Sequence, residues 1–135
     1  MWILSLIPSC HREGEVGLSQ NDQVGIDSVV SACPDIDSLQ SCLRYFERTA
    51  NELGVILAYK ELGVRYREAA RFNEAIGCHR EGLRLAMQRK DTSEVIQALN
   101  NIGTNFRRLG IMDEASNYHY RLSLIHISEP TRLLS

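Results

Sequence analysis

Histidine and cysteine are the residue types in this 135-residue chain whose spacing could support metal or redox chemistry. His79 and His119 lie forty residues apart. A metal ion held between them would need further ligands, and no acid stands one helical turn, three or four residues, from either histidine. We therefore expect both to be packed or half-exposed side chains, and we expect no metal site.

The four cysteines stand at positions 10, 33, 42 and 78, and no two of them form a Cys-x-x-Cys motif. Zinc binding and thioredoxin-like chemistry therefore have no support in the sequence. Cys78 falls in a predicted helix, where a free cysteine packs as a small hydrophobic residue. Cys33 and Cys42 could pair only if the turn at Pro34 brings them close, and we expect them to stay unpaired.

The familiar motifs of enzyme active sites are missing from the sequence. It contains no Gly-x-Gly-x-x-Gly, no Walker loop, no Gly-x-Ser-x-Gly and no His-Glu-x-x-His. The acids Glu52, Glu61 and Glu68 are spread along predicted helix surfaces. There they suit ion pairs with residues one turn away better than they suit general acid and base catalysis. We predict that the chain is not an enzyme, has no catalytic residues and binds no cofactor.

The composition favours a packed domain without affinity for nucleic acid. Apolar residues make up 44% of the chain, which is enough for a hydrophobic core. The formal net charge is −2, so the chain has no general attraction to polyanions. At this length we expect one domain, or a piece of a larger protein.

The elements that must position any functional residue repeat every forty residues. The segment 59–66 aligns with 99–106, and the match continues from 70–80 to 110–120. Such a period indicates stacked supersecondary units. Apolar residues recur at three- and four-residue steps, which predicts helices, and one glycine per unit lets two helices approach closely. We expect these residues to pack the units: Leu62, Gly63, Tyr66, Ala75, Ile102, Gly103, Phe106 and Ala115.

The pattern divides the chain into parts. Residues 1–34 are expected to be poorly structured, with at most a marginal helix around 25–33, because Pro34 separates it from the next helix. Residues 35–121 hold the repeats, as a half-unit 35–50, a unit 54–89 and a truncated unit 93–121. The predicted helices are 36–50, 54–69, 73–89, 93–109 and 112–122. No alternating run is long enough to argue for a sheet, so the predicted class is all-α.

The repeated residues resemble the tetratricopeptide repeat (TPR), in a long-helix variant of about forty residues against the usual thirty-four or so. In that family a leucine–glycine pair and an aromatic residue sit on the first helix and alanine on the second, as in Leu62, Gly63 and Ala75. His79 and His119 depart from the pattern, since a bulky residue is expected there. The resemblance implies antiparallel helix pairs in a right-handed α-solenoid, of which this chain is a fragment.

The resemblance also implies a binding surface, because the first helices of such units line a concave face that holds a protein or peptide. Arg67 and Arg107 are equivalent across the repeat, and arginine can hold a carboxylate through two hydrogen bonds. We therefore expect an acidic or polar peptide, although the family's Lys and Asn clamp for a C-terminal carboxylate is not reproduced. Alternatively, the arginines are solvated or pair with Glu61, Glu68 or Asp113. The ligand-facing positions correspond to Lys60, Val64, Arg67, Glu68, Asn100, Thr104, Arg107 and Arg108.

Segments 58–63 and 98–110 are similar to the repeat regions of bacterial signalling proteins, especially those of gut Bacteroidetes. In those proteins the repeats precede a membrane segment and a histidine kinase or DNA-binding output module. The similarity implies the sensor or interaction region of a signal-transduction protein, without kinase activity of its own. The alternative is a free-standing TPR scaffold or lipoprotein adaptor. The compartment stays open between periplasmic or membrane-associated and cytoplasmic.

Both ends of the chain carry unusual sequence. Residues 122–132 resemble the in-frame translation of a transposase sequencing adapter, so we predict that 122–135 is a non-native tail. The first ten residues are too short for a membrane-spanning helix, which needs about twenty apolar residues. Residues 7–10 resemble the cleavage box of bacterial lipoproteins, which would make Cys10 a lipidated membrane anchor. No Lys or Arg precedes them as a signal peptide requires, and a frayed N-terminus is the other interpretation.

Overall fold

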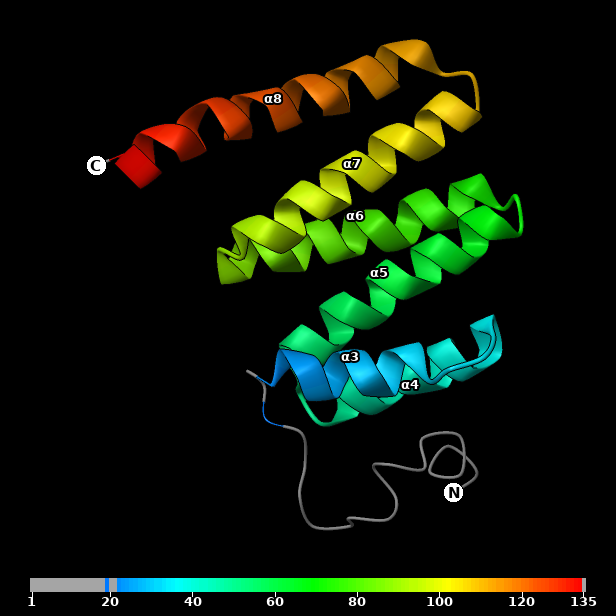
Figure 1. The fold of residues 1–135 in the computed structure, drawn as a ribbon. Helices are drawn as coiled ribbons and strands as arrows, with labels where there is room; N and C mark the ends of the chain where they lie inside the picture. The colour runs from blue at the N-terminus through cyan, green and yellow to red at the C-terminus, as the bar shows by residue number, and fades with distance from the viewer. Residues whose placement is uncertain (1–18, 20–21, 135) are drawn as a thin grey trace.

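The chain folds into helices stacked one on the next (Figure 1). The computed structural model describes residues 19 and 22–134, with side chains as far as residue 126. All regular structure in these residues is helical, which confirms the all-α class for this part of the chain. From α4 to α8, each helix packs against the next one along the chain, while α3 packs against α5. The helices are α3 (Gln23–Ser31), α4 (Ile36–Arg48), α5 (Glu52–Glu68), α6 (Phe72–Arg89), α7 (Thr92–Arg108) and α8 (Met112–Leu134).

Short polar side chains begin most of these helices. Asp22, Asp35, Asn51 and Asp91 are the N-cap residues of α3, α4, α5 and α7. Each side chain accepts a hydrogen bond from the backbone N–H three residues further on. These bonds satisfy donors that the first turn of a helix leaves unpaired, and each is typically worth about 1 kcal/mol. The N-cap residue of α6, Arg71, makes no such side-chain bond.

Residues in the left-handed conformation end the helices at intervals of twenty residues. Ala50, Ala70, Lys90 and Gly110 have φ angles of 52°, 60°, 59° and 79°. In each turn this residue donates to the carbonyl three positions back, and the next residue donates to the carbonyl five positions back. This pattern of bonds is the Schellman motif, which satisfies carbonyls at the end of a helix. One helix with its turn therefore takes twenty residues, which is half of the forty-residue period.

Two clusters of buried side chains form the core. The first lies mainly between α3, α4 and α5 and includes Ile26, Leu39 and Phe46. The second lies between α6, α7 and α8 and includes Leu99 and Ile102. The residues expected to pack the units are all buried: Leu62, Gly63, Tyr66, Ala75, Ile102, Gly103, Phe106 and Ala115.

The element boundaries differ from expectation chiefly at the two ends. Helices α4 to α7 begin and end within two residues of the predicted ranges. Within the segment 1–34, expected to be poorly structured with at most a marginal helix around 25–33, the structure has α3, and Ile26, Val29 and Val30 of this helix are buried. Helix α8 continues to Leu134 instead of ending near 122. The non-native origin of 122–135 stays a prediction, and Cys10 lies outside the described residues.

Candidate binding surface

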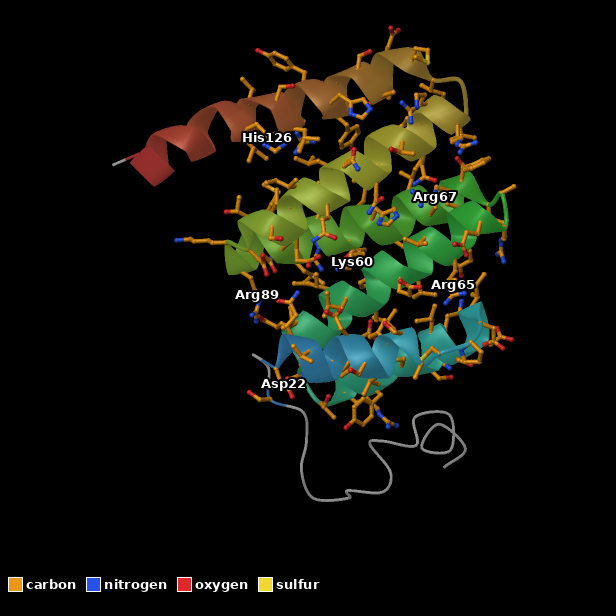
Figure 2. The ribbon with its side chains drawn as sticks, in the orientation of Figure 1. Asp22, Lys60, Arg65, Arg67, Arg89 and His126 are labelled. Atoms are coloured by element: carbon orange, nitrogen blue, oxygen red, sulfur yellow. The ribbon has the colours of Figure 1, made fainter. Side chains whose placement is uncertain are left out.

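Helices α5 and α7, the predicted first helices of the two units, are joined by two polar contacts. Lys60 Nζ donates to Glu94 Oε1 over 3.2 Å. The guanidinium of Arg67 donates to Asn101 Oδ1 over 3.4 Å. Both contacts link residues 34 positions apart, seven residues further along each helix. Figure 2 labels Lys60 and Arg67, which lie two helical turns apart on α5.

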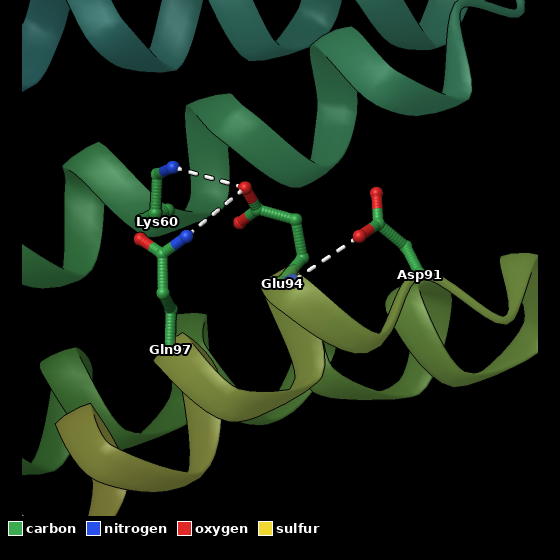
Figure 3. A network of polar contacts seen from close by, with 4 residues as sticks. All are labelled: Lys60, Asp91, Glu94 and Gln97. Carbon is green, nitrogen blue, oxygen red and sulfur yellow. Dashed lines mark hydrogen bonds and ion pairs between the residues drawn. The ribbon is translucent and has the colours of Figure 1, made fainter. Parts of the chain in front are cut away.

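Lys60 belongs to a half-buried polar network (Figure 3). Its partner Glu94 is 4% exposed, while Lys60 is 26% exposed. The same Glu94 oxygen accepts a hydrogen bond from Gln97, and the Glu94 backbone N–H donates to the Asp91 carboxylate. A carboxylate buried this far needs a cation beside it, because its own hydration is lost. The positive charge of Lys60 is therefore engaged by Glu94.

Two asparagines continue the polar seam between α5 and α7. Asn101 is half-buried and accepts the bond from Arg67. Asn105 lies one turn further along α7, is fully buried, and donates from Nδ2 to the backbone carbonyl of Asn101 over 2.8 Å. The seam holds the guanidinium of Arg67 at the edge of α7 through its contact with Asn101.

The remaining predicted residues of α7 form the open part of the surface. Asn100, Arg107 and Arg108 are exposed, and Thr104 is half-buried. Within residues 22–126, no acidic side chain forms an ion pair with Arg107 or Arg108. These two arginines also stand in the last turn of α7, where positive charge is favoured by the helix dipole. They are the cationic groups of this surface that are open to a ligand.

Glu68 belongs to a different hollow from Lys60 and Arg67. It lines an open depression with Arg65 and Arg71 of the α5–α6 hairpin and with Asp35 and Asp37 at the start of α4. Figure 2 shows Arg65 on the α4 side of α5, away from Arg67. The charges in this hollow are largely matched, since Arg65 pairs with Glu61 and Arg71 with Glu74. Val64 of α5 is half-buried.

The Asp35 carboxylate in that hollow is also occupied. It accepts hydrogen bonds of 2.7 Å from both the hydroxyl and the backbone N–H of Ser38. These bonds lower the pKa of Asp35, the hydroxyl having the larger effect. Both bonds go to Oδ1, and together they hold the Asp35 carboxylate at the start of α4.

His79 fills the space between α5 and α6 beneath this surface. It is 2% exposed, and burial lowers its pKa to about 4, with the charge of Arg67 adding to the effect. His79 also borders a cavity of about 10 Å³ together with Lys60 and Glu94. A cavity of this size has room for about one water molecule. This cavity is therefore too small for a larger ligand.

Sequence reasoning missed Glu94, Asn101 and Asn105 as parts of the surface. Glu94 was not among the residues expected on the surface. The signal that could have found its partner is the repeat itself, because α5 and α7 are equivalent helices of neighbouring units. A lysine on one and an acid on the next can meet at a constant offset, here 34 residues. The alternative pairing of Glu61 with the predicted arginines is not observed, since Glu61 pairs with Arg65.

No three His, Cys, Asp or Glu side chains in the described part of the chain gather where a metal ion could be bound. None of the helices described is both long enough and apolar enough to cross a membrane. Comparison of the chain with protein-family models, with curated proteins and with solved structures finds no match.

Proposed function

We propose that this chain is a protein- or peptide-binding module of the tetratricopeptide type, a fragment of a right-handed α-solenoid. Its antiparallel helix pairs would be α5 with α6 and α7 with α8, preceded by α3 and α4. Two observations support the proposal. Helices α5, α6 and α7 each take twenty residues with their turns, and Gly63 packs on His79 as Gly103 packs on His119, so both units use one internal contact. Stacks of this kind expose an extended face for binding.

The ligand that suits the face of α5 and α7 is an acidic peptide. The observation that carries this is the pair of exposed arginines, Arg107 and Arg108, beside the hydrogen-bonding side chains of Asn100 and Thr104. Arginine binds carboxylates with two parallel hydrogen bonds, and such charge-assisted bonds are among the strongest available at a surface. Lys60 supports this face by holding Glu94, and it contributes to ligand binding only through that contact.

The setting we propose is the sensor or interaction region of a bacterial signal-transduction protein. The support is the similarity of segments 58–63 and 98–110 to the repeat regions of such proteins. The alternative is a free-standing scaffold or a lipoprotein adaptor. Resequencing the locus from source DNA, upstream of Met1 and beyond the codon of Tyr120, separates them. A frame that runs on into a membrane helix and an output domain supports the sensor, and a frame that ends after more repeats supports the adaptor.

Binding can be tested by selecting peptides from a displayed random library on the full chain. We expect the enriched peptides to be rich in Asp and Glu. The charge-reversal variant Arg108→Glu should weaken their binding at least roughly tenfold, because one charge-assisted bond is lost and a repulsion is added.

The matched control is Arg48→Glu, which reverses an exposed arginine in the last turn of α4 and should leave binding unchanged. Circular dichroism of both variants checks that the helices persist. Failure of any peptide to enrich would argue against a peptide-binding function. Enriched peptides that bind Arg108→Glu as well as they bind the unchanged chain would move the site away from α7.

A further inference from the structure

Cys33 and Cys42 lie together in the core, where the turn after α3 leads into α4. Cys33 is 2% exposed, Cys42 is fully buried, and both belong to the same hydrophobic cluster. A hydrogen bond joins the two side chains, and the Cys33 thiol also donates to the carbonyl of Val29 over 3.5 Å. The turn at Pro34 therefore brings the two side chains together, and both cysteines are free thiols in the structure, as the sequence led us to expect.

A covalent link at this point would matter because α3 is weakly anchored. The helix has nine residues, fewer than the 12–15 or so that an isolated helix needs to be stable in water. It packs chiefly against α5, through Ile26, Val29 and Val30, and has little direct packing against α4. Cys33 lies just beyond the end of α3, and Cys42 lies near the middle of α4. A bond between them would fasten α3 to the helix after it.

We propose that Cys33 and Cys42 form a reversible thiol–disulfide site whose co-substrate is a low-molecular-weight disulfide. In the first step the Cys33 thiolate attacks one sulfur of the small disulfide, breaks its S–S bond and releases one small thiol. In the second step Cys42 attacks the Cys33 sulfur of the mixed disulfide and releases the second small thiol. The two cysteines lose two electrons, the small disulfide gains them, and the two thiol protons end on the released thiols.

The surroundings of the cysteines assign their roles. The hydrogen bond from Cys42 lowers the pKa of Cys33, and this effect exceeds the opposing effect of burial. A lower pKa raises the share of thiolate, which is the attacking species in thiol–disulfide exchange. Cys78 is the internal contrast, because burial and the neighbouring Glu74 raise its pKa to about 11. Cys42 is the resolving cysteine, since it already touches the sulfur that it must attack.

Burial also sets how the reaction begins. Both sulfurs are covered while α3 is docked, so a small disulfide reaches Cys33 only when α3 moves off α5. Short, weakly packed elements open at a much lower free energy than the core does. Once the second step is complete, the disulfide opposes further opening of α3, and reduction by small thiols restores the original state.

The test uses the full chain with Cys10→Ser and Cys78→Ser, so that Cys33 and Cys42 are the only thiols. The chain is equilibrated with mixtures of reduced and oxidised glutathione, quenched with acid, alkylated and analysed by peptide mass spectrometry. We expect a Cys33–Cys42 disulfide whose equilibrium constant in buffer exceeds that in denaturant at least roughly tenfold, because the fold holds the sulfurs together. The oxidised chain should then melt at a higher temperature than the reduced chain.

Added Cys33→Ser and Cys42→Ser substitutions assign the order of the steps. The chain that keeps Cys33 should accumulate a mixed disulfide, and the chain that keeps Cys42 should react more slowly. If either variant fails to fold, the equilibrium constants in buffer and in denaturant still test the proposal, because they are measured on the chain that keeps both Cys33 and Cys42. An equilibrium constant that is no larger in buffer, or a lower melting temperature on oxidation, would overturn the proposal.

Discussion

Gly63 lies directly against the imidazole ring of His79, so that a β-carbon on Gly63 would stand 2.3 Å from His79 Nε2. The equivalent contact in the next unit joins Gly103 to His119, where a β-carbon would stand 3.1 Å from Cε1. The first contact is the tighter one, in keeping with the full burial of His79 and the half-exposure of His119. In each unit, a histidine of the second helix thus packs directly on the glycine of the first helix.

This contact predicts that Gly63→Ala is destabilising. The new methyl group would overlap the ring of His79, which is only 2% exposed. Even after the gain of about 1 kcal/mol in helix propensity, we expect a net loss of about 2 kcal/mol in the free energy of unfolding. Urea unfolding followed by circular dichroism measures it.

The matched control is Gly77→Ala on the exposed face of α6, where a β-carbon would meet no atom within 4 Å. That substitution should stabilise the chain by about 1 kcal/mol through helix propensity alone. Gly103→Ala should fall between the two, because the half-exposed ring of His119 can move aside. Equal effects at Gly63 and Gly77 would show that His79 does not pack on Gly63 as described.

Burial of His79 predicts a specific dependence of stability on pH. The pKa of His79 is about 4 in the folded chain against 6.5 for an ordinary histidine. Between these values the unfolded chain binds a proton that the folded chain does not. Stability should therefore fall as the pH falls from about 6.5 towards 4, by about 3 kcal/mol in total, and level off below that.

His79→Gln removes this contribution, so its unfolding free energy should converge on that of the unchanged chain as the pH falls. His119→Gln, at the equivalent position of the next unit, is the matched substitution at a half-exposed site. The measurement is urea unfolding at a series of pH values. Parallel curves for His79→Gln and the unchanged chain would contradict the burial of a neutral histidine.

The ion pair between Lys60 and Glu94 predicts an asymmetric cost of substitution. Lys60→Met leaves a carboxylate that is 4% exposed without its cation, and should cost about 2 kcal/mol. Glu94→Gln leaves an amine that can turn towards water, and should cost about 1 kcal/mol. The double variant should lose less than the sum of the two, and a double-mutant cycle measures the difference. Small, additive losses would mean that the pair does not join α5 to α7.

The turns predict where the chain can be stabilised. Ala70 and Lys90 adopt the left-handed conformation, which costs a residue with a β-carbon roughly 1 kcal/mol relative to glycine. Ala70→Gly should therefore raise the free energy of unfolding by about 1 kcal/mol, and Gly110→Ala should lower it similarly. The control is Ala69→Gly, one residue earlier, where φ is −83° and glycine brings no relief. No difference between Ala69→Gly and Ala70→Gly in thermal unfolding would contradict the turn geometry.

The helical class and most boundaries could be predicted from the sequence because they depend on short-range patterns. The apolar steps around Leu62 and Ile102 mark helix faces, and the two aligned glycines mark the period. Helix α3 was expected only as a marginal helix, because it has nine residues and is stabilised mainly by packing against α5. The sequence likewise placed Gly63 at a helix crossing but could not say that His79 is the side chain that fills the crossing.

The binding surface was less predictable because it depends on pairs of residues that are distant in the chain. Lys60 forms an ion pair with Glu94 of the next unit, and Arg67 forms a hydrogen bond with Asn101. Arg67 and Arg107 occupy equivalent positions in the repeat. In the structure, however, Arg67 forms a hydrogen bond with Asn101, whereas Arg107 is exposed. The same limit applies to Glu68, which lies in the hollow beside Arg65.

Amide chemical shifts in NMR spectra test the central claim most directly, with an acidic peptide from the library selection titrated into the labelled full chain. The account predicts that the largest shifts fall on the face shared by α5 and α7, at Val64, Arg67, Asn100, Thr104, Arg107 and Arg108. Shifts confined to α6 and α8, or centred on the hollow between Arg65 and Asp37, would contradict it, because ligand binding would then bypass the surface that the two units form together.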